Sequence, residues 1–295
     1  MKTEYIRKLI NYRQLFIFLI SAIMYFLGGG LAHYLGAKFQ PVEFFLGLLW
    51  IVCLHFSGFL LMTYFSSSKY LIEDEEVNEW FDKNRKIFLQ LAYLTLTICG
   101  FVVVYFIIRR NISIFLGTIL LLTIFGLVGL IISPFNLANK GYLEIMLAIF
   151  QGSLIPATSF FILTNDYHNL LLFITFPMTC LAIASFLAYN FSTFARDQII
   201  GRKTLLRSLT WQRGIPIHNL LLIVVYGFYI SGFILRFPPR FIWPALLTFP
   251  LACLQIFWLF RISQGGRPIW GFFNALITSV YGLSAYFIAF TFWIR

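Results

Sequence analysis

The chain has 295 residues, of which 60% are hydrophobic, 20% aromatic and only 11% charged. Because soluble domains carry about a quarter of charged residues, this composition excludes a soluble globular protein and predicts an integral membrane protein. The net charge of +11 indicates attraction to anionic membrane lipids, and no basic and aromatic platform for nucleic acid is needed to explain it.

Apolar runs recur along the whole chain, each long enough to cross a hydrocarbon layer of ~30 Å as an α-helix. Their continuity favours helices over barrel strands, which would alternate over about ten residues. We therefore predict a single all-α domain over residues 1–295, a polytopic bundle of nine transmembrane helices. The predicted spans are 14–36, 43–65, 87–108, 112–132, 143–164, 169–191, 215–235, 241–260 and 269–293.

The distribution of Lys and Arg predicts the orientation. With the N-terminus inside, sixteen of these residues fall in cytoplasmic segments and six in external ones, with Arg109 and Arg110 as the main exceptions. The positive-inside rule then places the N-terminus in the cytoplasm and the C-terminus outside. We expect a multi-pass protein of a bacterial cytoplasmic (inner) membrane.

Two polar segments stand out on the predicted cytoplasmic side. Residues 66–86, "SSSKYLIEDEEVNEWFDKNRK", are acidic and then basic, as in a surface helix. Residues 192–214, "STFARDQIIGRKTLLRSLTWQRG", are basic around one acid, Asp197. The simplest explanation of each segment is a solvated connector. The basic residues of the second segment meet either anionic lipid headgroups or a phosphorylated ligand.

The cysteines and histidines are scattered and lack ligand spacing. We expect buried apolar cysteines, histidines in packing or interfacial roles, and neither a disulfide framework nor a zinc site. Glu144, near the start of a span, is expected to cap its own helix. The residues concerned are Cys53, Cys99, Cys180, Cys253, His33, His55, His168 and His218.

Two stretches carry a resemblance to a known family. They are "SPFNLANKGYLEIMLAIFQGSLIPATSFFI" (residues 133–162) and "ARDQIIGRKTLLRSL" (residues 195–209). With the nine spans and the polar segments after spans two and six, they resemble the UbiA superfamily of intramembrane prenyltransferases, and most closely its dihydroxynaphthoate prenyltransferase branch. The matching residues are Gly141, Glu144, Gly152 and Pro156, then Asp197, Gly201, Arg202, Lys203, Thr204 and Leu205.

The resemblance implies a function. Members of the family hold Mg²⁺ with two aspartate-rich motifs against an isoprenyl diphosphate, and they transfer the prenyl group to an aromatic quinone precursor or a lipid. Mg²⁺ bridged by carboxylates neutralises the departing diphosphate. By this resemblance Asp197 would be the catalytic, metal-binding acid, and Arg196, Arg202 and Lys203 would bind the diphosphate.

The chain departs from the family at both aspartate motifs. Met62, Thr63 and Ser66 stand where the first motif would have Asn, Asp and Asp, and the second motif keeps only Asp197. One hypothesis is a relocated Mg²⁺ site that joins Asp197 to acids of the first polar segment. The alternative is a catalytically lapsed protein that binds a lipid or quinone or is a subunit of a membrane complex. The candidate metal ligands are Asp197, Asp74, Glu75 and Glu76.

Overall fold

The computed structural model describes residues 12–65, 75–109, 112–131, 135–234 and 238–294. These residues are almost entirely helical, and no strand occurs among them. Nine helices in this part of the chain are long and apolar enough to cross a membrane, so the predicted all-α class with nine spans is confirmed. The integral membrane character follows from their length and composition.

The membrane-crossing helices include two that are built from several pieces. The fifth span joins α6, η3 and α7, and the eighth joins α10 and α11. The η3 segment is a single turn of π-helix. The elements are α2 (Tyr12–Tyr34), α3 (Pro41–Phe65), α4 (Glu75–Arg109), α5 (Ile114–Ile131), η2 (Leu137–Lys140), α6 (Leu143–Ile149), η3 (Phe150–Leu154), α7 (Ile155–Thr164), α8 (Asn169–Ile199), α9 (Leu205–Ile234), α10 (Pro239–Leu246), α11 (Phe249–Ser263) and α12 (Trp270–Trp293).

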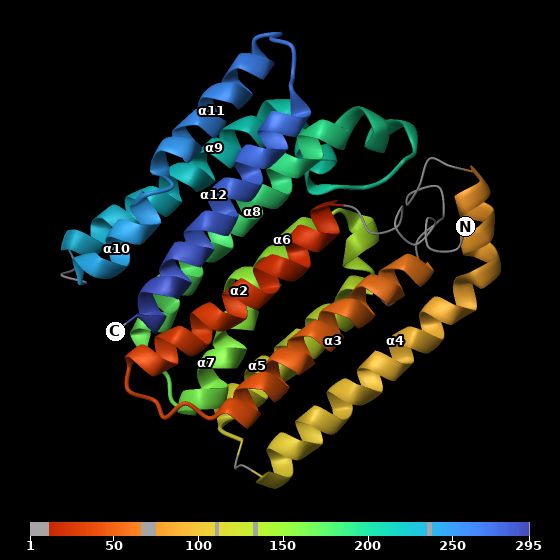
Figure 1. Cartoon of the computed structure of the whole chain (residues 1–295). Coiled ribbons are helices and arrows are strands. Elements are labelled where there is room, and N and C mark those ends of the chain that lie inside the picture. Colours follow the sequence, from red (N-terminus) through yellow and green to blue (C-terminus); the bar gives the residue numbers. More distant parts are fainter. Residues whose placement is uncertain (1–11, 66–74, 110–111, 132–134, 235–237, 295) are drawn as a thin grey trace.

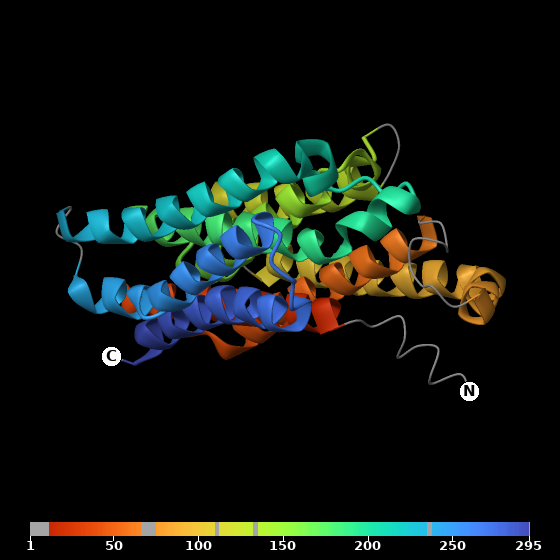
Figure 2. The ribbon, with the colours of Figure 1, turned by 90° about the horizontal axis from the view of Figure 1, so that it is seen from above.

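The helices form a bundle in which α8 is central and α4 peripheral (Figure 1). The central helix α8 packs against α9, α12 and the α6–η3 segment, whereas α4 packs mainly along α3. Figures 1 and 2 show the starts of α2 and α4, the end of α3 and the α8–α9 turn at the same end of the bundle. The helices that flank the two polar segments of the sequence therefore meet at one end of the bundle.

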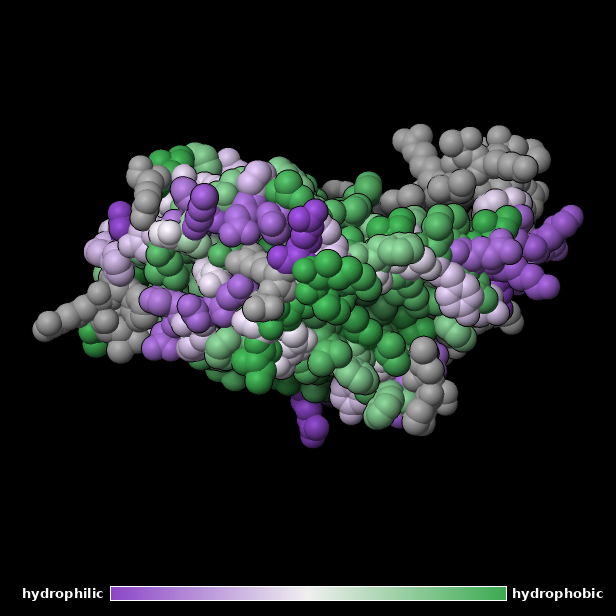
Figure 3. Space-filling model, turned by 90° about the horizontal axis from the view of Figure 1, so that it is seen from below, coloured by the Kyte–Doolittle hydropathy of each residue, from purple (hydrophilic) through white to green (hydrophobic). Residues whose placement is uncertain are grey.

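The outer surface between the polar ends is apolar. Figure 3 shows a broad hydrophobic surface between hydrophilic groups at the two sides of the view. On the outer helices, Phe101 and Ile108 of α4 and Phe125 of α5 are about 70% exposed, at 71%, 76% and 68%. Such a belt is the surface that a protein exposes to hydrocarbon rather than to water.

Close contacts between helices fix the middle of the bundle. A Cβ on Gly28 would lie 1.9 Å from the carbonyl oxygen of Pro156, so α2 and α7 meet backbone to backbone. A Cβ on Gly152 would lie 2.4 Å from the Cα of Thr179, so η3 presses on α8. Small residues allow this approach, as is usual between membrane helices.

The helices continue beyond the apolar spans into the polar segments. Helix α8 runs to Ile199 and α9 begins at Leu205, so most of residues 192–214 are helical rather than loop, although α9 is kinked at Thr210 (φ 65, ψ 167). The turn contains Gly201 at φ 79, and the hydroxyl of Thr204 accepts a hydrogen bond from the N–H of Arg207. Hydropathy marks the edge of the hydrocarbon, but backbone hydrogen bonding and a cap decide where a helix ends.

One cysteine differs from the expectation of burial. Cys53, Cys99 and Cys180 are buried, whereas Cys253 is exposed. Cys253 lies on α11, one of the outer helices, where a small apolar side chain is equally compatible with hydrocarbon.

Candidate functional site

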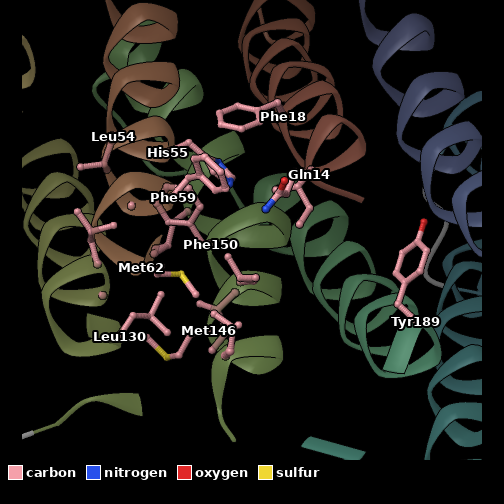
Figure 4. A pocket seen from close by; sticks show the side chains of 18 of the residues that line it. Gln14, Phe18, Leu54, His55, Phe59, Met62, Leu130, Met146, Phe150 and Tyr189 are labelled. Atoms are coloured by element: carbon pink, nitrogen blue, oxygen red, sulfur yellow. The ribbon is translucent and has the colours of Figure 1, made fainter. Parts of the chain in front are cut away.

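A chamber of about 680 Å³ lies inside the N-terminal half of the bundle. Its volume is in the range of pockets that hold small molecules, about 300–1,000 Å³. Figure 4 shows side chains of α2, α3, α6, η3 and α8 around it. Apolar side chains dominate the wall, among them Leu54, Phe59, Met62, Leu130, Met146 and Phe150.

The end of the chamber at the α8–α9 turn is polar and basic. Ser192, Thr193 and Arg196 line it from α8, and Arg202 lines it from the turn. Two of the three predicted diphosphate-binding residues, Arg196 and Arg202, therefore lie together at one end of an otherwise apolar space. The third, Lys203, is exposed and is not part of the lining.

Asp197 lies behind this basic end rather than in the chamber wall. Its side chain is buried, with 1% of the residue exposed, and it is absent from the lining. The hydroxyl of Thr193 donates to Oδ2 at 2.8 Å, and Nη1 of Arg202 lies 3.9 Å from Oδ1. The side chain of Asp197 is thus an ion-pair partner of Arg202 at the polar end of the chamber.

Glu144 joins three helices around the same turn. Nδ2 of Asn190 on α8 donates to Oε1 at 2.6 Å, and the backbone N–H of Leu205, the first residue of α9, donates to Oε2 at 3.3 Å. Both side-chain oxygens of this buried residue therefore accept a hydrogen bond. Glu144 caps α9 and not its own helix, which corrects the expectation from the sequence.

Gly141 makes this contact of α6 with α9 feasible. Its φ is 89, and a Cβ there would lie 3.2 Å from the carbonyl oxygen of Thr204. A side chain at this position would disfavour both the backbone conformation and the close approach. Gly141 and Glu144, noted in the sequence for their resemblance to a family segment, therefore position the α8–α9 turn.

The described side chains do not fit a Mg²⁺ site. Mg²⁺ prefers several oxygen ligands, usually carboxylates with water and phosphate. In the described ranges, no group of three His, Cys, Asp or Glu side chains is arranged to hold a metal. At the positions of the missing first motif, Met62 lines the chamber, and the hydroxyl of Thr63 donates to Phe59 O on its own helix at 2.7 Å.

The remaining predicted metal ligands are not tested by the structure. Asp74 lies outside the described residues, and the side chains of Glu75 and Glu76 at the start of α4 are also not described. A Mg²⁺ site that joins these three acids to Asp197 stays a prediction.

Several lining residues had no signal of their own in the sequence. Gln14 of α2, His55 of α3 and Asn274 of α12 all line the chamber, although they lie far apart in the chain. Figure 4 shows Gln14 and His55 on neighbouring helices of the chamber. Only the packing of these helices reveals that the three polar side chains share one space.

Comparison with known proteins identifies the fold. No protein-family model matches the sequence, and no curated protein matches it. Among solved structures, the chain is similar to the apo structure of a UbiA homolog from Aeropyrum pernix K1, with a TM-score of 0.63. The similarity covers 90% of this chain and 96% of that chain at 12% sequence identity. The fold is therefore UbiA-like.

Proposed function

We propose that this UbiA-like membrane protein binds an isoprenoid or similar lipid in its chamber, with an anionic head group such as a diphosphate at Arg196 and Arg202. The observation that carries the proposal is the chamber itself, an apolar space of about 680 Å³ with two arginines at one end. A ligand with an apolar chain and an anionic head group matches such a space.

The arginines are suited to a phosphate-bearing head group. A guanidinium group offers several N–H donors in a fixed fork, which matches phosphate oxygens better than the point charge of lysine does. Arg202 also forms a loose ion pair with Asp197, with 3.9 Å between Nη1 and Oδ1. This arrangement can bind an anionic head group without a metal ion.

In this proposal the protein binds the lipid without transferring a prenyl group. The single buried carboxylate, Asp197, already has Thr193 and Arg202 as partners. Departure of a diphosphate needs more charge neutralisation than binding does, and the described carboxylates do not supply a Mg²⁺ site for it. The protein would then act as a lipid- or quinone-binding module, alone or as a subunit of a membrane complex.

The second candidate function is prenyl transfer to an aromatic quinone precursor or a lipid. The observation in its favour is the similarity to a UbiA homolog over 90% of this chain. It requires Mg²⁺ and carboxylates beyond Asp197, of which Asp74, Glu75 and Glu76 are the candidates.

Both candidates are tested by one experiment. The purified protein is incubated with radiolabelled prenyl diphosphates of several chain lengths and an aromatic acceptor, either with Mg²⁺ or with EDTA. Saturable binding that is equal under both conditions, with no product, supports the binding function. Prenylated product that forms only with Mg²⁺ and is lost in Asp197→Asn would establish transfer instead, and absence of binding at every chain length would exclude both.

A further inference from the structure

A histidine, His55, lies in the chamber wall away from the basic end. His55 lines the wall among apolar groups, with its ring between those of Phe18 and Phe150 at centroid distances of 5.0 and 5.4 Å. It lies ten residues before Phe65, the last residue of α3, or about 15 Å by the rise of an α-helix. Figure 4 shows the imidazole at the chamber beside Phe59.

The hydrogen bonds around Ser21 define which nitrogen of His55 carries the proton. The hydroxyl of Ser21 donates its only hydrogen to the carbonyl oxygen of Ile17 at 2.7 Å. Oγ of Ser21 also accepts a hydrogen bond from Nε2 of Gln151 at 3.1 Å, and this oxygen lies 3.0 Å from Nδ1 of His55. With the hydroxyl hydrogen of Ser21 on the carbonyl oxygen of Ile17, Nδ1 of His55 is assigned as the donor of the 3.0 Å contact.

Gln151 fixes this arrangement from a third element. Its Nε2 also donates to the carbonyl oxygen of Ile17 at 2.9 Å, so the amide nitrogen is oriented towards α2. Gln151 belongs to the π-helical turn η3, which is pressed on α8 through Gly152. Single π-helical turns are often found at functional sites. The tautomer of His55 is therefore set by a rigid contact of three helical elements.

A neutral imidazole with its proton on Nδ1 presents an unprotonated Nε2. This atom has no hydrogen-bond partner among the residues that the structure describes, and the ring faces the chamber. Oε1 of Gln151 is a second buried acceptor in the same cluster without a partner in the described part of the chain. The cluster thus has unused acceptors and no unused donor, and an unpaired acceptor in an apolar space is unfavourable.

We propose that His55 is a binding residue for a hydroxyl group, so that the chamber takes up a lipid-soluble phenol or alcohol whose O–H donates to Nε2. The hydroxyl lies deeper than the anionic group at the arginines. A carbonyl or ether at this depth offers no hydrogen and leaves Nε2 unpaired. The inference rests on the proposed function only in that the chamber takes up a lipid.

The test compares a matched pair of probes, para-octylphenol and its methyl ether, in equilibrium titrations of the purified protein in detergent. The two differ in the hydroxyl hydrogen and in a methyl group. We expect His55→Phe, which keeps an aromatic ring but removes the acceptor, to lower the preference for the phenol by roughly fivefold to tenfold. Partition into detergent cancels when the ratio is compared between variants.

A second variant and a control separate this effect from a general loss of structure. Ser21→Ala removes the acceptor that holds the proton on Nδ1, so the preference for the phenol should fall there too. Ser57→Ala is the control, because the hydroxyl of the equally buried Ser57 bonds only to Cys53 O and Leu54 O of its own helix. The control should keep the preference of the wild type.

NMR of isotope-labelled histidine nitrogens gives an independent readout. The Nε2 signal that disappears in His55→Phe should shift when the phenol is added and not when the ether is added. An equal phenol-to-ether ratio in wild type and His55→Phe, with no shift, would overturn the inference. If prenyl diphosphate still binds in that case, only the role of His55 fails, and if it does not bind, the proposed function fails as well.

Discussion

Replacement of Glu144 is expected to destabilise the fold more than the loss of any surface acid. In Glu144→Ala, the side chain of Asn190 loses a hydrogen bond of 2.6 Å and the backbone N–H of Leu205 loses one of 3.3 Å. A typical hydrogen bond contributes about 0.5–1.5 kcal/mol, and removing the partner of a buried donor costs about 1–3 kcal/mol. We expect a loss of about 2–4 kcal/mol in the free energy of unfolding, measured by reversible unfolding in mixed micelles.

Two further variants make the measurement specific. Glu144→Gln keeps an acceptor oxygen for Asn190 but cannot accept from the N–H of Leu205, so about half of the loss is expected. Glu79→Ala removes an exposed acid of α4 and should change stability by less than about 0.5 kcal/mol. If Glu144→Ala is no less stable than Glu79→Ala, the role of Glu144 as the joint of α6, α8 and α9 is refuted.

Two further predictions concern packing and head-group binding. Gly152→Ala places a Cβ 2.4 Å from the Cα of Thr179 and should cost about 1–3 kcal/mol, seen as a lower melting temperature. Gly227→Ala meets no atom within 4 Å and should not be destabilised, and an equal loss in both variants would contradict the packing of η3 on α8. Arg202→Gln should weaken prenyl diphosphate binding roughly tenfold. Lys203→Gln, at an exposed position, should change this binding little. If titrations showed that Lys203→Gln weakens binding more than Arg202→Gln does, the assignment of the basic end as the head-group site would be wrong.

The fold could be predicted from the sequence because its main determinant is local. Runs of apolar residues of sufficient length must form helices in a membrane, since no water is available to satisfy the backbone. The geometry of the breaks within the fifth and eighth spans does not follow from hydropathy, because η3 and the α10–α11 junction lie inside continuous apolar runs. Their local geometry depends on packing, such as the contact of Gly152 with α8.

The basic end of the chamber was partly predictable. Arg196 and Arg202 were proposed from a motif, and they line the chamber. The position of Lys203 outside the lining could not be predicted. Neighbouring residues of a turn point in different directions, and only the fold decides which of them reaches the chamber. The burial of Asp197 was not predictable either. Its hydrogen-bond partner Thr193 stands where the family motif has an acid, so comparison with the motif registers only the loss of that acid.

The role of Glu144 and the contacts of His55 could not be derived from the sequence. Glu144 contacts residues 46 and 61 positions away, and Ser21 lies 34 positions from His55 and 130 from Gln151. No periodicity or spacing encodes such distances. By contrast, the expected packing role suits His33, whose ring stacks on Trp293.

Filling the chamber tests the proposed binding function most directly. Gly126 lines the chamber, and a Cβ there would meet only Met146 Cε at 3.7 Å, so Gly126→Phe can occupy the space without a backbone clash. Gly100→Phe adds the same ring at an exposed position with no atom within 4 Å. In titrations with labelled farnesyl diphosphate, we expect wild type and Gly100→Phe to bind equally and Gly126→Phe to bind at least roughly tenfold more weakly. Equal binding by all three proteins would contradict the chamber as the lipid site.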